Sequence, residues 1–534
     1  MLSSVAYAAS RTEAQDDVAQ ERKHRSLCKR WSEIGGKRAL CGRFIDDNAP
    51  NLNCNGRTLN LNYYHLENCN PSMRLREIAS AMKFSTTPRT RTGWLSFVSC
   101  NSTWPDQTVQ KLTLEAQLLR WDTISLCIIN FTKYALIMYT ALMYIERYSE
   151  NTLVNKRANN KVLIVLGARQ VGKTTMVKHF LAQERAVRIN LDVEVEKQKL
   201  LAVAKLAPAE AVRVLGDPDF IVIDEAQRLP KTGMIVKGWY DSDIRPQVIL
   251  LGSSSLNLLD VAAESLTGRN EKIFLPPLTF EEIVRSQQWL PKESSFDLLA
   301  QDFSEQVGVL LEQCMLHGSY PSTIVQSNKR EFLENLVADY LLKDILEAAL
   351  VKEPEVIRKL LTLVAYQTGS LVSVQELANA LRISRSTVEK YLRLLEEMFI
   401  IFRLPAWSTN PRKEISKSSK IFFWDTGVRN ALVGDFTPVE RRADIGSLWE
   451  NWVVAEFAKH NMINGGFRKL FYWRSRSGSE VDLLVKNDER LSAFEIKWRS
   501  GKMSKKATLF DVYKTKIEMV NRNNPFIEAR LKRT

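Results

Sequence analysis

Continuous apolar runs recur in the middle of this chain, and small or polar residues follow each of them. The runs are "KVLIVL" at 161–166, "FIVID" at 220–224 and "QVILLG" at 247–252. Uninterrupted runs rich in Val and Ile are typical of parallel strands that are buried on both faces. Helical stretches separate the runs, so the pattern predicts an α/β fold in which helices cover both faces of a parallel sheet.

The apolar spacing becomes helical after this region. "PLTFEEIV" opens a stretch that runs to about residue 370. The stretch contains no group of residues with catalytic spacing. We therefore interpret residues 286–370 as linker and lid helices beside the sheet.

Two short apolar helix faces then follow one another. Their residues are Leu377, Ala380 and Leu381 in the first and Val388, Leu392, Leu395 and Met398 in the second. The tripeptide "RIS" between them predicts a tight turn, and Ser386 with Glu389 has the spacing of a capping box. The runs "FIIFRLPAW" and "SKIFFWDTG" would supply wing strands. The pattern predicts a winged helix-turn-helix over residues 371–435.

The second helix of this pair carries three basic side chains, Arg385, Lys390 and Arg393. In DNA-binding proteins of this type, the N-terminal part of the second helix enters the major groove. DNA is therefore one candidate partner. A protein partner is the alternative, because winged helices also serve as docking modules or as lids beside AAA cores.

The C-terminal residues predict a hairpin that gathers charges. The apolar strands "EVDLLV" and "LSAFEIKW" flank the polar turn "KNDER". Successive side chains alternate between faces, so Glu495 and Lys497 share a face, which Asp482 can join from the other strand. Two carboxylates can hold a divalent metal, and a lysine can orient water or stabilise a phosphate.

One more acid belongs to the helix before this hairpin. Glu450 shares the helical spacing of Val453, Val454 and Phe457. It therefore lies on an apolar face, where an unpaired carboxylate is unfavourable. A metal or a lysine would account for it, and Glu456 is a second, weaker candidate.

The residues after the first apolar run have the pattern G-x-x-x-x-G-K-T, which is typical of a phosphate-binding loop. Its two glycines permit backbone angles that bring the N–H groups around a phosphate, helped by the N-terminus of the next helix. Lys173 is placed to reach the terminal phosphates, and the Thr174 hydroxyl is placed to bind Mg²⁺. The candidate nucleotide-binding residues are Gly167, Ala168, Arg169, Gln170, Val171, Gly172, Lys173, Thr174 and Thr175.

The other two apolar runs end in residues that complete such a site. Asp224 and Glu225 end the second run, at the sheet edge where α/β proteins bind ligands. Asp224 is the candidate Mg²⁺ ligand, and Glu225 is the candidate general base for an attacking water. Ser253 and Ser254, after the third run, are polar groups that can sense a γ-phosphate. This arrangement favours hydrolysis over binding alone.

These motifs follow one another in the order of a known family. "MYIERYSEN", "LGARQVGKTT", "FIVIDEAQRLP", "LTGRNEKIFLPPLTFEE", "HGSYPS" and "YLLKDI" are similar to a microbial family of AAA-type P-loop ATPases with a C-terminal domain of unknown function. The resemblance covers about residues 143–500. It implies ATP as the nucleotide and a cytoplasmic location. Arg269 matches a family position, as an arginine finger, a γ-phosphate sensor or an ordinary ion-pair residue.

The charged residues of the tail also resemble a known fold. Glu450, Asp482, Glu495 and Lys497 are similar to the site of PD-(D/E)xK nucleases, which the family often carries. The usual proline before the aspartate is replaced by Val481. The resemblance therefore implies a nuclease-like fold and leaves two alternatives for the cluster: metal-dependent DNA cleavage, or a structural salt-bridge group.

Charge and cysteine content add two constraints. The net charge is +14, and the last 50 residues hold 13 basic and 6 acidic side chains. This excess favours a nucleic-acid partner, although a solvated basic surface would give the same count. The seven cysteines form no zinc pattern. Only Cys314 lies within the resemblance, as expected in a reducing compartment.

The first 142 residues resemble nothing in this family. Residues 124–145 are apolar enough to cross a bilayer. Asn130 and Lys133 lie within them, and a charge near the bilayer centre is costly, so we do not expect a membrane partner. Because the resemblance starts with "MYIER", our hypothesis is that translation begins near Met143. A membrane anchor and a loosely ordered extension are the alternatives.

The sequence thus predicts five parts and one main activity. The parts are an unassigned extension (1–142), an AAA-type ATPase domain (143–285), linker helices (286–370), a winged helix (371–435) and a nuclease-like domain (436–534). The predicted function is Mg²⁺-dependent ATP hydrolysis coupled to a DNA-binding winged helix and the nuclease-like tail. The alternative is a nucleotide-dependent switch that binds protein partners. The sequence leaves the oligomeric state open.

Overall fold

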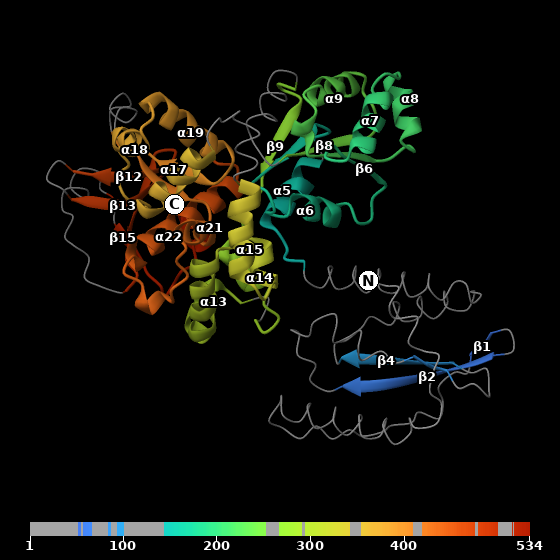
Figure 1. The fold of residues 1–534 in the computed structure, drawn as a ribbon, viewed down its shortest axis with the longest axis horizontal. Helices are drawn as coiled ribbons and strands as arrows, with labels where there is room; N and C mark the ends of the chain where they lie inside the picture. The colour runs from blue at the N-terminus through green and yellow to red at the C-terminus, as the bar shows by residue number, and fades with distance from the viewer. Residues whose placement is uncertain are drawn as a thin grey trace. The chain divides into compact units, whose positions relative to one another are not determined.

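The computed structural model describes residues 144–157, 159–252, 266–290, 294–341, 354–408, 419–475, 479–499, 515 and 517–533, together with four strands before residue 101 (Figure 1). The chain divides into two compact units, Met1–Ala141 and Leu142–Thr534. The unit division falls within two residues of the predicted start of the ATPase domain.

The first unit contains a four-stranded sheet that the sequence pattern did not predict. Its strands are β1 (Leu52–Cys54), β2 (Arg57–Leu66), β3 (Phe84–Thr86) and β4 (Gly93–Cys100), in the order β1-β2-β4-β3. Except for Tyr144 and Ile145, the apolar segment 124–145 lies outside the described residues. No helix within the described ranges combines the length and apolar character needed to span a bilayer.

The second unit begins with the predicted parallel sheet. Its strands are β5 (Val162–Leu166), β6 (Ala186–Asn190), β7 (Phe220–Asp224), β8 (Gln247–Gly252) and β9 (Asn270–Phe274). They lie in the order β6-β7-β8-β5-β9, and every pair is parallel. The prediction of an α/β parallel sheet is therefore confirmed, and the strand order is that of a P-loop NTPase.

Helices cover both faces of this sheet, as the strand composition requires. They are α5 (Tyr148–Arg157), α6 (Lys173–Phe180), α7 (Glu194–Val203), α8 (Pro208–Val214) and α9 (Thr232–Asp241). The central strands are buried along their whole length because alternate side chains enter two different cores. Leu163 and Val165 belong to one core, and Ile164 and Leu166 belong to the other.

The described parts of residues 280–366 are mainly helical, as predicted for the linker region. They are α11 (Phe280–Arg285), α12 (Phe296–Asp302), α13 (Ser304–His317), α14 (Pro321–Val325), α15 (Lys329–Asn335), the π-helix η4 (Leu336–Leu341) and α17 (Pro354–Tyr366). The predicted helix pair follows as α18 (Val374–Leu381) and α19 (Arg385–Glu397). Strand β10 (Ile401–Leu404) then pairs antiparallel with β11 (Lys420–Phe423), and α21 (Thr426–Val433) comes next.

The tail is a helix followed by a four-stranded sheet. Helix α22 (Ile445–Ile463) precedes β12 (Lys469–Arg474), β13 (Glu480–Asn487), β14 (Arg490–Ile496) and β15 (Ile517–Val520), and α24 (Glu528–Arg533) ends the described chain. The sheet order is β12-β13-β14-β15, antiparallel except for the parallel pair β14–β15. The predicted hairpin is β13–β14.

The apolar cores of the second unit cross the predicted domain boundaries. One core joins Leu163 of the parallel sheet to Leu361 of α17 and Leu395 of α19. Another joins Ile283 of α11 to Val453 of α22 and Val485 of β13. The boundaries at 285/286, 370/371 and 435/436 are therefore not breaks in the packing, and they remain predictions.

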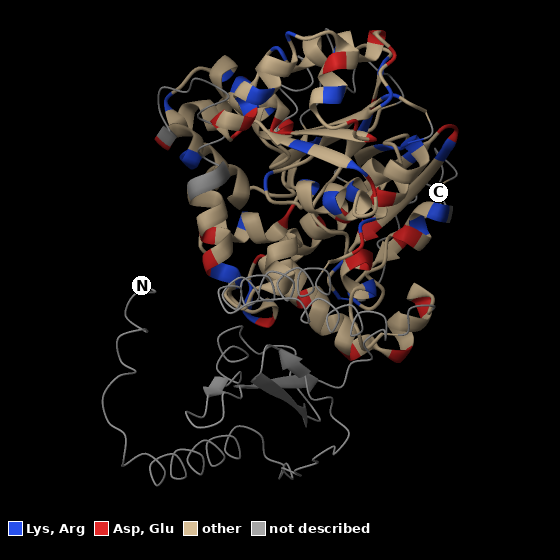
Figure 2. Ribbon diagram, turned by 90° about the vertical axis from the view of Figure 1, so that its right-hand side faces the viewer, with Lys and Arg blue, Asp and Glu red and all other residues tan. Residues whose placement is uncertain are grey.

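Basic and acidic residues are interspersed along the ribbon of the described elements, as Figure 2 shows. A case for a nucleic-acid partner must therefore rest on a local group of cations.

Candidate functional site

The phosphate-binding loop connects β5 to α6, and its two glycines are required for different reasons. A Cβ at Gly167 would lie 2.2 Å from the backbone oxygen of Leu275, so only glycine fits at this point. Gly172 has a φ of 96°, which lies in the left-handed region that favours glycine. Helix α6 begins at the next residue, Lys173. The loop therefore passes tightly from the strand into the helix, as the motif predicts.

The Lys173 side chain folds over this loop. Its Nζ lies 2.9 Å from the carbonyl oxygens of both Gly167 and Ala168, and the side chain is buried. A buried ammonium with carbonyl partners keeps its donors satisfied, and it can exchange them for phosphate oxygens with little movement. Thr175 is exposed on the first turn of α6.

The hydroxyl of Thr174 and the carboxylate of Asp224 are in direct contact. Thr174 Oγ1 donates to Asp224 Oδ2 at 2.9 Å, although 50 residues separate them. Asp224 ends β7 and is 5% exposed. A hydroxyl and a carboxylate held side by side at a strand tip are oxygen donors that suit Mg²⁺. The residues therefore fit the predicted metal.

Glu225 leaves the strand in a different direction from Asp224. Its φ of 52° turns the chain sharply after β7. Its carboxylate accepts a hydrogen bond from Gln227 Nε2 at 2.5 Å and stays half-buried. The two adjacent acids are thus held by separate contacts, which allows separate roles.

Strand β8 lies between β5 and β7. Its C-terminal tip is therefore placed between the phosphate-binding loop and Asp224. Ser253 and Ser254 follow this tip in the sequence, but both lie outside the described residues, and their role as γ-phosphate sensors stays a prediction.

Arg269 corrects one expectation. It precedes β9, and the register pairs Asn270 with Val162 at the N-terminal end of β5. The phosphate-binding loop follows the opposite end of β5, roughly 15 Å away at the rise of a strand. Arg269 bonds Asp241 at 2.6 Å instead. It is an ion-pair residue and not a γ-phosphate sensor for its own chain, because motif order does not reveal which end of a strand a residue occupies. A finger directed at another chain stays a prediction.

Helices α18 and α19 occupy the predicted positions and leave the three predicted cations exposed. Arg385, Lys390 and Arg393 all lie on the solvent side of α19. The buried face of the same helix consists of Val388, Leu392, Leu394 and Leu395. The three cations therefore lie on the exposed side of the helix, which also carries Glu389, Glu396 and Glu397.

The predicted capping box of α19 is wrong, because the N-cap lies two residues before Ser386. The helix begins at Arg385, and the Ser384 hydroxyl accepts the Thr387 N–H at 3.1 Å. Glu389 pairs with Arg403 of β10 at 3.0 Å. Ser386 therefore lies inside the first turn, and Glu389 fixes the helix to the strand that follows it.

The hairpin β13–β14 brings three of the four predicted tail residues together. Lys497 Nζ lies 3.0 Å from Glu495 Oε1 and 3.9 Å from Asp482 Oδ2. Asp482 also accepts the Ile496 N–H at 2.7 Å. Burial raises the pKa of Asp482, and Glu495 adds to that shift.

Glu450 meets a lysine that sequence reasoning missed. Lys420 of β11 bonds Glu450 at 2.8 Å and Glu480 at 2.5 Å, and its side chain is buried. Burial raises the pKa of Glu450 to about 7, while Lys420 opposes the shift and Asp482 adds to it. The sequence signal for Lys420 was weak: a lysine that opens the apolar strand "KIFF".

The predicted three-carboxylate metal site of Glu450, Asp482 and Glu495 is not among the described groups whose ligand atoms all lie within 4.8 Å of one another. Ammonium groups from Lys420 and Lys497 bond these acids. The role of the three acids as metal ligands stays a prediction.

One group of potential ligands among the described residues does meet that distance, and it consists of Glu281, Glu456 and His460. All three are buried and already bonded. His460 Nε2 lies 2.8 Å from Glu281, and Lys459 Nζ lies 2.7 Å from Glu456. The two bases face the two acids directly, so the group is an internal ion network that fastens α11 to α22.

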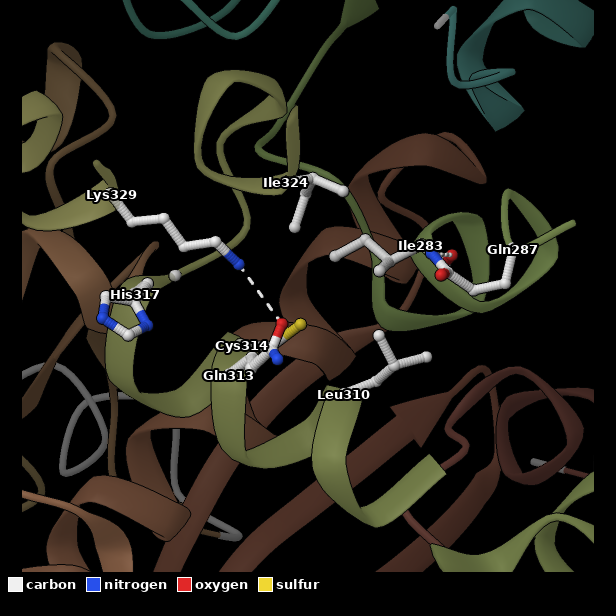
Figure 3. Close-up of a pocket in the computed structure, with 9 residues that line it drawn as sticks. Ile283, Gln287, Leu310, Gln313, Cys314, His317, Ile324 and Lys329 are labelled. Atoms are coloured by element: carbon white, nitrogen blue, oxygen red, sulfur yellow. Dashed lines mark hydrogen bonds between the residues drawn. The ribbon is translucent and has the colours of Figure 1, made fainter. Parts of the chain in front are cut away.

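A small pocket of about 90 Å³ lies beside α13 (Figure 3). Lys329 Nζ bonds Gln313 Oε1 at 3.2 Å across it. Burial raises the pKa of the Cys314 thiol to about 12, so this thiol is not a nucleophile at neutral pH. The pocket is lined by Ile283, Gln287, Leu310, Gln313, Cys314, His317, Gly318, Ile324 and Lys329. None of these residues belongs to the phosphate-binding loop or to the tail cluster.

Three protein families match consecutive parts of the chain. The AAA domain family matches residues 159–284, which contain the parallel sheet and the phosphate-binding loop. Two families described as domains of unknown function, DUF8612 and DUF4143, match residues 309–438 and 445–526. The parallel sheet and the phosphate-binding loop of the second unit therefore match the AAA domain family, in agreement with a P-loop NTPase fold.

The similar proteins are themselves uncharacterized. A protein of Mycobacterium tuberculosis is 27% identical over 370 residues, which cover 66% of this chain and 74% of the relative. A protein of Methanocaldococcus jannaschii is 25% identical, covering 61% of this chain and 72% of the relative. Among solved structures, a Walker-type ATPase of Pyrococcus abyssi is 16% identical with a TM-score of 0.39, covering 54% of this chain and 96% of that one.

Proposed function

We propose that this chain is a Mg²⁺-dependent ATPase whose nucleotide cycle acts on helix α19, a DNA-binding element. The observation that carries the ATPase part is the 2.9 Å contact between Thr174 and Asp224, next to Glu225. Lys173 binds the terminal phosphates, Thr174 and Asp224 hold the metal, and Glu225 takes the proton of the attacking water. Mg²⁺ would neutralise phosphate charge when bound.

Two substitutions test the ATPase assignment. Lys173→Ala should lose ATP binding, because the terminal phosphates lose their cationic partner. Glu225→Gln should keep ATP binding and lose at least about 100-fold in turnover, since the metal ligands remain and the base does not. Phosphate release and fluorescent-nucleotide binding measure the two effects. Glu210→Gln, at an exposed position of α8, is the matched control. Wild-type turnover in Glu225→Gln would disprove the base assignment.

The DNA part rests on the exposed cations of α19. Two of the three acids on this helix, Glu389 and Glu396, bond Arg403 of β10, and Glu397 is the third. Arg385, Lys390 and Arg393 remain directed to solvent on a helix that follows a short turn, the arrangement that enters a major groove.

A salt titration tests this second part. Arg385→Ala with Arg393→Ala should weaken duplex binding and reduce the slope of log K against log salt by about two, because each lost phosphate contact releases about one counterion fewer. Arg330→Ala, an exposed arginine on α15, is the control. Unchanged affinity and slope would favour the alternative, a nucleotide-dependent switch that binds a protein.

The tail supports a narrower proposal. A helix, three antiparallel strands and a parallel fourth strand carry Glu450, Asp482, Glu495 and Lys497, which supports a nuclease-like fold. Because Lys420 and Lys497 bond these carboxylates, we do not include DNA cleavage in the proposed function.

A further inference from the structure

Arg147 bonds the phosphate-binding loop from outside the motif that defines it. Its Nη1 donates to the carbonyl oxygen of Val171 at 2.8 Å, and its Nη2 donates to that of Pro276 at 2.6 Å. The residue is 4% exposed. Gly172 adjoins the same guanidinium, since a Cβ there would lie 3.9 Å from Arg147 Nη1.

The contact with Val171 sets the orientation of one peptide group. A trans peptide is planar, with its carbonyl and its N–H on opposite sides. The carbonyl of Val171 and the N–H of Gly172 belong to the same peptide. When Arg147 holds the carbonyl, the Gly172 N–H must point away from Arg147. That N–H belongs to the loop that cradles phosphates, so Arg147 orients a phosphate-binding donor without touching the nucleotide.

The third nitrogen of Arg147 connects this loop to helix α11. Arg147 Nε lies 3.3 Å from Glu282 Oε1, and both side chains are almost fully buried. Glu282 also accepts the N–H groups of Tyr148 at 2.6 Å and Thr279 at 2.8 Å. The second of these bonds closes the capping box at the start of α11. Both carboxylate oxygens of Glu282 thus accept hydrogen bonds, which favours one geometry for its buried pair with Arg147.

The other side of the same helical turn bonds the tail. The Phe280 N–H donates to Glu456 at 2.8 Å, and Glu281 lies 2.8 Å from His460 Nε2. Both partners belong to α22, the helix that carries Glu450. The first turn of α11 is thus bonded to the phosphate-binding loop on one side and to the tail on the other.

We propose that Arg147 is a positioning residue for the phosphate-binding loop, and that the pair Arg147–Glu282 transmits the nucleotide state of that loop through α11 to α22. The proposal rests on the proposed ATP binding. It requires two arrangements of the Val171 peptide, with and without phosphate, that α11 distinguishes.

Hydrogen exchange of the full chain, with and without Mg²⁺ and a non-hydrolysable ATP analogue, tests the proposal. In the wild type, the analogue should slow exchange in residues 166–175 and also in α11 and α22. Arg147→Met should weaken analogue binding by about 10- to 100-fold, the range for a lost hydrogen bond to a charged group. At a saturating concentration of the analogue, Arg147→Met should regain protection from hydrogen exchange in the loop but not in α22.

Matched variants separate transmission from mere stability. Arg157 lies close after Arg147 in the sequence and forms an exposed ion pair with Glu184. Arg157→Met removes this pair and should change neither the response of the loop nor that of α22. Glu282→Gln keeps the size of the side chain and should keep loop protection while losing the response of α22. Arg147→Lys retains the charge but not the two-pronged contact, so it should be intermediate and serves if Arg147→Met fails to fold.

The outcomes are distinguishable. If the analogue leaves the loop of the wild type unprotected, ATP binding fails, and this inference fails with it. If the loop is protected while α22 never responds, or if Arg147→Met and Glu282→Gln both respond like Arg157→Met, the coupling is wrong and ATP binding stands.

Discussion

Glu450 shows how much the role of a single residue depends on a partner that is distant in the sequence. Its position on an apolar helix face required a metal or a lysine, and the structure supplies Lys420. Burial nevertheless raises the pKa of Glu450 to about 7, from an ordinary value of 4.5. A folded-state pKa above the unfolded value contributes stability that is fully present below pH 4.5 and is lost as the pH rises through 7.

We therefore expect the wild type to lose about 1–3 kcal/mol of unfolding free energy between pH 4.5 and pH 8 because of this group. Glu450→Gln has no such titration, so its stability relative to the wild type should rise over the same range. Urea unfolding of both proteins at pH 5 and pH 8, followed by tryptophan fluorescence, measures the difference. A wild-type-to-variant difference that is independent of pH would show that Glu450 does not titrate in this window.

Motif spacing in the sequence identified some residues of the candidate site and missed others. Lys173, Thr174 and Asp224 were identified because motif spacing encodes a loop and a strand tip, and the structure places Thr174 against Asp224. Lys420 and Arg147 were missed because their partners come from other segments, and no local spacing records such a pair. Whole-sequence motif order also misled the interpretation of Arg269, whose position depends on strand register.

At the scale of elements, the start of α19 gives different roles to two serines that are two positions apart, Ser384 and Ser386. Ser384 accepts the Thr387 N–H, whereas Ser386 lies within the helix. Ser384→Ala should destabilise this helix by about 1 kcal/mol, the usual effect of losing an N-cap. Ser386→Ala should have a much smaller effect. Hydrogen exchange in α19 compares the two variants, and equal protection would restore the capping box predicted from Ser386.

Elements with strong periodicity were predicted well. The continuous runs at β5, β7 and β8 and the alternating hairpin β13–β14 correspond to observed strands. The four strands before residue 101 lacked such a pattern and were not predicted. The parallel strand β15 was missed too, since pairing with β14 joins residues about 24 positions apart along the chain, as in Ala493 with Ile517.

At the scale of the whole molecule, the packing of the second unit contradicts the picture of independent modules in a row. Phe280 of α11 packs against Trp452 of α22, with ring centroids 5.4 Å apart, and against Phe526, at 5.6 Å. Lys459 donates to the backbone oxygen of Leu278 at 3.0 Å. The segment that follows the ATPase sheet is therefore buried by the tail.

We expect a chain of residues 143–435 to be unstable, although it retains every residue of the ATP site. Its α11 and α13 would expose Phe280, Ile283, Leu311 and Met315, which belong to the core shared with the tail. Exposure of four such side chains costs about 6–12 kcal/mol, which is comparable with the whole stability of a domain, about 5–15 kcal/mol. The truncated chain should aggregate or unfold at 25 °C.

Residues 143–534 provide the matched control, because the unit division falls at Leu142 and leaves intact all four apolar cores that the described residues form. Size-exclusion chromatography and a thermal melt, each with and without Mg²⁺ and ATP, compare the two truncated chains. The longer chain should melt cooperatively and gain stability from the nucleotide, because a ligand that binds only the folded state stabilises it. Residues 143–435 could instead melt as cooperatively as residues 143–534 and at nearly the same temperature. In that case the core shared with the tail is not needed for the ATPase fold, and the packing between α11 and α22 would not couple the two.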